Sequence, residues 1–158
     1  MFRRSLALTR FARIGATALG LGVAFLFGRA SAVDPALRPT GASIDDILKK
    51  NPPAEGEAFR VLPVASGRDS SVSVVRARKA LRPHYHEGRE ETVYVVRGGG
   101  TMRLGDKERP IRAGDLVHIP RGVVHGFVNG RRGDTVVVSV MSPPFDGIDR
   151  HFLDSPSP

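Results

Sequence analysis

The stretch HYHEGREETVYVVRG, residues 84–98, joins two closely spaced histidines to a run of strand-forming residues. Side chains alternate between the two faces of a β-strand, so His84 and His86 share one face and Tyr85 points the other way. Their Cα atoms are then about 6.5 Å apart, at a rise of about 3.3 Å per residue. Two imidazoles at this separation can converge on one point.

The same alternation separates the glutamates of this stretch. If Val93 and Val95 line a dry interior, Glu91 shares their face, whereas Glu90 takes the opposite one. A carboxylate at the head of an apolar face is costly unless a partner neutralises it, and a divalent cation is the usual partner. The parity therefore favours Glu91 as a metal ligand over Glu90, and Glu87, inside the loop, is a weaker candidate.

A second stretch, GDLVHIPRGVVHGFVN at residues 114–129, contains two further histidines. His118 lies between Val117 and Ile119, so it points away from the interior if those two residues fill the core. A proline and a glycine then bend the chain, and His125 opens the next strand. His125 is therefore the better third ligand.

The length and charge of the chain indicate one domain and give no reason to expect a nucleic-acid partner. The 158 residues carry a formal net charge of +8, but residues 1–32 hold five arginines and no acidic residue. The rest of the chain has 19 basic and 16 acidic residues, few aromatics and no basic stripe, which is typical of an ordinary solvated surface. No cysteine is present, so the fold must be stable without disulfides.

Residues 1–32 are predicted to be a signal peptide. Four arginines precede the apolar run IGATALGLGVAFLFG (14–28), and RASAVDP then supplies an A-x-A pattern with cleavage before Val33. The run is shorter than the roughly 20 residues of a membrane span. We therefore expect a periplasmic or secreted protein with no stable membrane span after cleavage, and an uncleaved anchor is the alternative. Arg3 and Arg4 also match loosely the twin-arginine signal, which exports folded proteins.

Residues 33–58 are predicted to form an N-terminal arm that contains a short helix. The segment SIDDILKK has Ser43 as its N-cap, acidic residues in its first turn and lysines in its last turn. The following NPP ends the helix, since proline cannot continue the hydrogen-bond ladder.

From residue 59 onward the sequence predicts an all-β domain. Short β-branched runs are separated by turn segments, and the runs are FRVLPV, SVSVVRA, ETVYVVR, TMRL, DLVHIP, HGFVN and TVVVSVM. Strands at this regular spacing, without helical patterns between them, predict one sandwich or barrel over residues 59–153. Gly105 and Asp106 are expected in the turn of a hairpin, and DSPSP at 154–158 is predicted to be a disordered tail.

The two histidine stretches together resemble the two motifs of the cupin superfamily. The first motif runs H-x-H, three or four residues, E, six residues, G; the second runs G, five residues, P-x-G, two residues, H, three residues, N. The matching residues are His84, His86, Glu91 and Gly98, and then Gly114, Pro120, Gly122, His125 and Asn129. One position departs, because cupins often have a glycine six residues before the first histidine and this chain has Arg78.

This resemblance implies a double-stranded β-helix, or jelly-roll barrel, of the small single-domain cupin type. It also implies a homodimer and one divalent metal bound by His84, His86, Glu91 and His125. Three neutral imidazoles and one carboxylate suit Mn, Fe, Co, Ni, Cu or Zn rather than Ca or Mg. The Irving–Williams order favours Cu or Zn unless the metal is loaded before export, when Mn or Fe is favoured. The alternative is that the three histidines are satisfied core residues.

The enzyme classes that the resemblance offers are dioxygenases, decarboxylases, isomerases and lyases acting on a small organic molecule. The first hypothesis is a metal-dependent enzyme of the dioxygenase type. A cupin that binds a metal, or a sugar or organic acid through it, without turnover is the alternative.

Several other residues are weighed as site candidates. Arg76 and Arg78 share a strand face with Val72 and Val74, so either guanidinium could hold a substrate carboxylate or phosphate if that face turns inward. Otherwise the pair marks a strand that emerges into solvent. Tyr85 and Met102 are expected to be packing residues, with lining of the pocket as the alternative. SPPFDGIDRHF near the end is expected to lie back over the barrel, with His151 on the surface.

Overall fold

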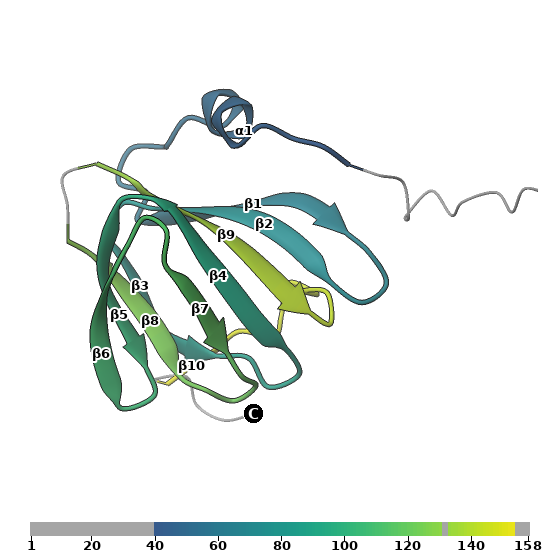
Figure 1. Ribbon diagram of the computed structural model, residues 1–158, viewed down its shortest axis with the longest axis vertical. Coiled ribbons are helices and arrows are strands. Elements are labelled where there is room, and N and C mark those ends of the chain that lie inside the picture. The colour runs from purple at the N-terminus through teal and green to yellow at the C-terminus, as the bar shows by residue number, and fades with distance from the viewer. Residues whose placement is uncertain (1–39, 131–132, 154–158) are drawn as a thin grey trace, which may run out of the picture. The chain divides into compact units, whose positions relative to one another are not determined.

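The computed structural model describes residues 40–130 and 133–153, which belong to one compact unit. Within these residues a helix, α1 (Ile44–Lys50), precedes ten strands, as predicted for an all-β domain with a short N-terminal helix (Figure 1). The strands are β1 (Phe59–Ser66), β2 (Ser71–Ala77), β3 (Ala80–Tyr85), β4 (Glu90–Arg97), β5 (Gly99–Leu104), β6 (Lys107–Arg112), β7 (Leu116–Ile119), β8 (His125–Asn129), β9 (Thr135–Ser142) and β10 (His151–Phe152).

The strands form two five-stranded antiparallel sheets that face each other. One sheet has the order β1-β2-β9-β4-β7 and the other β10-β3-β8-β5-β6. Figure 1 shows the two sheets curving around a shared interior. Apart from β1–β2 and β5–β6, neighbouring strands in both sheets are not consecutive in sequence, as in a jelly roll, so the predicted double-stranded β-helix is confirmed.

The interior is built by strict alternation along the strands. Val93, Val95, Val117 and Ile119 are buried in one apolar cluster, whereas Tyr94 between the first two is 46% exposed. Each fully buried valine contributes about 1.5–3 kcal/mol of hydrophobic stabilisation. The face assignment made from sequence parity is therefore correct for both β4 and β7.

Two glycines fix the turns around the β5–β6 hairpin. Gly105 has φ +63 in the predicted turn, and Gly98 has φ +83 where β4 turns into β5. A Cβ at Gly98 would lie 2.6 Å from Thr135 Oγ1 and 2.7 Å from its Cα, so this motif position accepts no side chain. Asn129, the last motif residue, donates to the Arg78 and Gly133 carbonyls and ties together the loops at this end.

The helix α1 covers the outer face of the sheet that contains β1 and β2. The side chain of Ser43 accepts from Asp46 N at 3.4 Å, which confirms the predicted N-cap. Leu48 then packs against Leu62, Val74 and Val136, which form a second apolar cluster.

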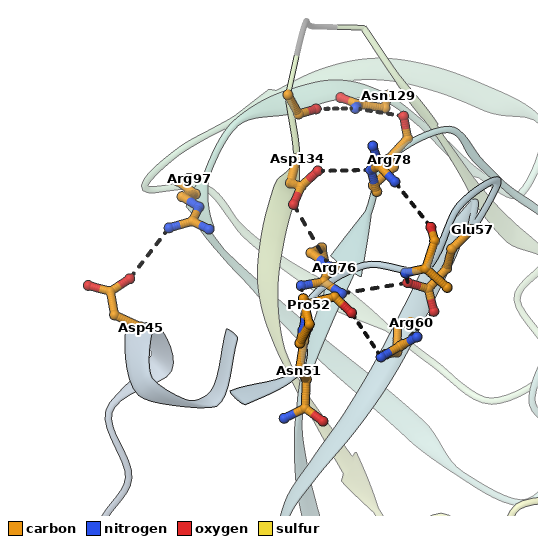
Figure 2. Close-up of polar contacts among 12 residues, drawn as sticks. Asp45, Asn51, Pro52, Glu57, Arg60, Arg76, Arg78, Arg97, Asn129 and Asp134 are labelled. Carbon is orange, nitrogen blue, oxygen red and sulfur yellow. Dashed lines mark hydrogen bonds and ion pairs between the residues drawn. The ribbon is translucent and has the colours of Figure 1, made fainter. Parts of the chain in front are cut away.

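Arg76 shares the face of Val74 on β2, so it points to this outer side and away from the cavity. Figure 2 shows its polar contacts there. Its side chain is 3% exposed; it donates to Asn51 O at 2.8 Å and lies 3.6 Å from Glu57 Oε2 and 3.8 Å from Asp134 Oδ2. Arg78 pairs with Asp134 at 3.3 Å. The hypothesis that Arg76 or Arg78 holds a substrate is therefore wrong: Arg76 fixes the N-terminal arm to the sheet. The alternation along β2 was predicted correctly. However, both faces of β2 are buried, so alternation alone could not show which face points into the barrel.

The predicted signal segment (1–32), the start of the arm (33–39) and the predicted tail (154–158) lie outside the described residues. Export and the homodimer therefore stay predictions. Within residues 40–130 and 133–153, no helix combines the length and hydropathy needed for a membrane span.

Candidate metal centre

Four predicted side chains come together between the two sheets. His84 is the second-last residue of β3, and His86 lies directly after the end of β3. His125 is the first residue of β8, where it pairs with His84. Glu91 faces them from β4 in the opposite sheet. All four side chains are buried, with 1–9% of each residue exposed. One ring nitrogen from each histidine lies within 4.8 Å of those of the other two.

Backbone carbonyls determine which ring nitrogen of each histidine carries the proton. Nδ1 of His84 is 2.8 Å from Arg82 O, Nδ1 of His125 is 2.9 Å from Val123 O, and Nδ1 of His86 contacts Asp149 O. A carbonyl oxygen only accepts, so each Nδ1 must be the donor. In the neutral imidazole the lone pair is then on Nε2, which is the tautomer that a metal ligand requires.

Burial keeps two of these imidazoles neutral. Burial and then the neighbouring His125 lower the pKa of His84 to about 4. Burial also lowers the pKa of His86, because it outweighs the opposing effects of the Asp149 carbonyl and the Glu91 charge. Both rings are therefore uncharged and able to bind a metal at neutral pH.

Glu91 brings a negative charge to this cluster. Burial opposes its ionisation, but His125, Ser139 and His86 together outweigh burial and hold the pKa of the Glu91 carboxyl below its ordinary value. Ser139 on β9 donates to Oε1 at 2.5 Å. Oε2 lies 3.2 Å from His125 Nε2 and 3.7 Å from His86 Nε2.

No protein donor lies between Oε2 of Glu91 and the Nε2 atoms of His86 and His125. Within the described residues, Nε2 of His86 and of His125 is buried without a hydrogen-bond partner. A carboxylate oxygen and imidazole lone pairs this close repel one another unless a proton or a cation lies between them. Three imidazoles and one carboxylate also form a complete donor set for a mid-row divalent ion. The cluster fits the predicted metal.

The remaining histidines and glutamates lie away from this centre. Glu87 and Glu90 are exposed. His118 is exposed on the outer face of β7, where its Nδ1 is 3.2 Å from Thr92 Oγ1. His151 is half-buried and stacks on Tyr85, with ring centroids 5.0 Å apart. The predicted outward direction of Glu90 and His118 is confirmed.

An interior cavity adjoins the centre. Its lining includes His84, Glu91 and His125 together with apolar residues, Met102 among them, so Met102 both packs in the core and lines the pocket. Arg150, which follows the loop after β9, also lines the cavity.

Sequence reasoning missed three residues that support the site: Ser139, Asp149 and Arg150. Ser139 could have been noticed as a polar residue on the inward face of TVVVSVM, between Val137 and Met141. Asp149 contacts His86 through its backbone carbonyl, which every residue type has, so the residue type at position 149 could not predict this contact. Arg150 lies in the segment predicted to fold back over the barrel, but an irregular segment has no periodicity from which to predict its direction.

A barrel of this topology with an inward histidine cluster agrees with the resemblance to the cupin motifs. The family model described as "Cupin domain" matches residues 72–141, which contain both motifs. This chain therefore carries a Cupin_2 domain at these residues, and its fold is the double-stranded β-helix of that family.

Individual relatives agree with this assignment. An uncharacterized protein of Aquifex aeolicus is 29% identical over 108 residues, covering 67% of this chain and 86% of the relative. Among solved structures, a conserved protein of Klebsiella pneumoniae with a double-stranded β-helix domain is 24% identical with a TM-score of 0.63, covering 75% of this chain and 100% of that chain. The Streptomyces nucleoside dehydratase Pac13 is 20% identical with a TM-score of 0.54, covering 63% and 82%. Proteins with this fold therefore include an enzyme.

Proposed function

We propose that this protein binds one divalent transition metal through His84, His86, His125 and Glu91, and that it is a metal-dependent enzyme acting on a small organic molecule. The observation that carries the proposal is the buried cluster of three Nδ1-protonated imidazoles, whose ligand nitrogens lie within 4.8 Å of one another, with the Glu91 carboxylate beside two of them. The candidate ions are Mn, Fe, Co, Ni, Cu and Zn.

The residues of this site have distinct tasks. The three histidines and Glu91 would hold the ion, while the carbonyls of Arg82, Val123 and Asp149 orient the rings, and Ser139 orients Glu91. A divalent ion bound there supplies a Lewis acid that polarises a carbonyl or activates a water. The apolar cavity excludes bulk water and strengthens every electrostatic contact within it.

Dioxygenase, decarboxylase, isomerase and lyase chemistry all fit four protein ligands with open positions beside an apolar cavity. The dioxygenase type is our first candidate. The non-catalytic binder is kept as the alternative for a specific reason: apart from the proposed ligands, the described residues lining the cavity provide only Thr135 and Arg150 as polar side chains. Neither is an ordinary general base at neutral pH.

Elemental analysis tests the metal site. The full-length chain, stripped with a chelator and reloaded separately with each candidate ion, is expected to retain one metal per chain. His86→Ala and His125→Ala should lose stoichiometric binding, whereas His118→Ala, which removes an exposed histidine, should retain it. Metal loss from the His118 variant alone would show that the inward and outward faces are inverted.

A substrate screen separates the enzyme from the binder. Oxygen uptake and product formation would be followed with catechol, flavonol, diketone and oxalate-type substrates. Turnover that requires metal and disappears in His125→Ala supports the enzyme. One metal per chain without turnover on any of these substrates favours the binder.

A further inference from the structure

The cavity beside the metal centre contains one cationic side chain that the proposed metal site does not use. Among the described residues, its wall is otherwise mostly apolar and includes Phe59, Val61, Val75 and Phe127. Arg150 enters this wall from the segment between β9 and β10. An arginine in an apolar wall needs a counter-charge, because burying an unpaired ion is strongly unfavourable.

The backbone that carries Arg150 is held by a set of polar contacts to the loop between β3 and β4. The Asp149 carboxylate accepts from Glu87 N at 2.8 Å and Gly88 N at 3.0 Å. Arg89 binds Asp146 with two hydrogen bonds, at 2.7 and 3.0 Å, and lies 3.3 Å from Asp149. On the other side, β10 pairs with β3. Arg150 is therefore fixed at its position relative to the histidines.

The guanidinium of Arg150 lies near two aromatic rings and lacks a protein counter-ion in contact among the described residues. Its carbon is 5.9 Å from the ring centroid of Phe59 and 5.4 Å from that of Phe145. Within residues 40–130 and 133–153, its Nε is buried without a hydrogen-bond partner, and no carboxylate forms an ion pair with it within 4.0 Å. Burial lowers the pKa of Arg150, although the more distant Glu91 charge acts in the opposite direction.

We propose that Arg150 binds a carboxylate of the substrate, so that the substrate class is small organic acids with an otherwise apolar body. This inference rests on the proposed function. Guanidinium and carboxylate match in geometry and charge, and the apolar wall accepts the rest of the molecule. A monoanion fits better than a phosphate dianion, because Arg150 is a single cation and Glu91 on the same cavity wall is negative.

Binding measurements with matched probes test this assignment. The Zn²⁺-loaded full chain would be titrated calorimetrically with benzoate, 2-oxobutanoate and butanoate, each compared with its amide of nearly equal shape, and with phenyl phosphate. We expect at least one carboxylate to bind at least tenfold more tightly than its amide. In Arg150→Met the carboxylate affinity should fall at least tenfold while the amide affinity changes less than twofold. Arg150→Lys, which keeps the charge without the fork geometry, should lie between the two.

The control variant is Arg109→Met. Arg109 is exposed on β6, 3.9 Å from Asp115 Oδ2, and does not line the cavity. It should bind every probe as the wild type does. Thermal unfolding of each variant checks that the fold is retained.

The role of Arg150 would be overturned if wild type bound no carboxylate, or bound carboxylates and amides with equal affinity. It would also be overturned if Arg150→Met still preferred carboxylates to amides, or if wild type preferred phenyl phosphate. The metal content of each sample, measured in parallel, separates this failure from failure of the metal site. A wild type that retains no metal contradicts the proposed function, and the same titrations on that metal-free protein still test Arg150.

Discussion

Replacing Ser139 with alanine would remove the hydroxyl that orients Glu91 while leaving all four proposed ligands in place. Ser139 is 4% exposed and donates to Glu91 Oε1 at 2.5 Å. A buried hydrogen bond to an ionised group contributes about 1.5–3 kcal/mol. We therefore expect Ser139→Ala to lose about 2 kcal/mol of unfolding free energy at pH 7, a decrease of roughly 6–10 °C in Tm.

The same variant should bind metal more weakly without losing stoichiometry. Groups that orient a metal ligand typically change the metal affinity by about 10–100-fold. Each tenfold loss removes about 1.4 kcal/mol of metal-induced stabilisation at a fixed metal excess. Unfolding in chelator and in excess Zn²⁺, together with a competitive metal titration, measures both effects.

The stability effect of Ser139→Ala should depend on pH with a definite sign. The pKa of Glu91 is lowered in the folded protein, so its contribution is present above the unfolded value of about 4.3 and is lost as the pH falls through the folded value. The difference between wild type and variant should therefore shrink below about pH 4.

Ser73→Ala is the matched control. Ser73 on β2 pairs with Ser139 across the β2–β9 ladder, and its replacement should change neither stability nor metal affinity by a comparable amount. Our account of how Glu91 is held would be refuted if Ser139→Ala kept a metal Kd within twofold of wild type and lost no stability at pH 7.

Two further predictions concern metal release and the turn at Gly98. The pKa of His84 lies at about 4 and that of His86 is also lowered, so protons should displace the metal only in acid. Metal occupancy measured after dialysis should be retained down to about pH 5. Release of half of the metal at the ordinary histidine pKa of about 6.5 would contradict this. Gly98→Ala, whose Cβ would overlap Thr135, should cost well over the roughly 1–2 kcal/mol of left-handed backbone strain alone. Gly105→Ala, at φ +63 with open space around it, should cost only that strain, and chemical denaturation of the pair measures the difference.

The comparison of parity with structure shows where sequence reasoning succeeded. Along β4 and β7, inward and outward side chains differ sharply in burial, so Glu91 could be separated from Glu90 and His118 from its neighbours. On β2 both faces are buried, one by the opposite sheet and one by α1. Arg76 is therefore inaccessible although it faces away from the cavity, and parity alone could not predict which side it occupied.

By itself, the sequence determined the all-β fold class and the helix over SIDDILKK through short-range spacing, and it indicated the four side chains between the sheets through strand parity and the two motifs that resemble those of cupins. Only the tertiary structure decided which groups orient those side chains and what else faces the cavity. The Asp149 carbonyl reaches His86 across 63 positions, and Arg150 enters the cavity from a segment without periodicity. Such contacts depend on how the chain folds back on itself, which local alternation does not encode.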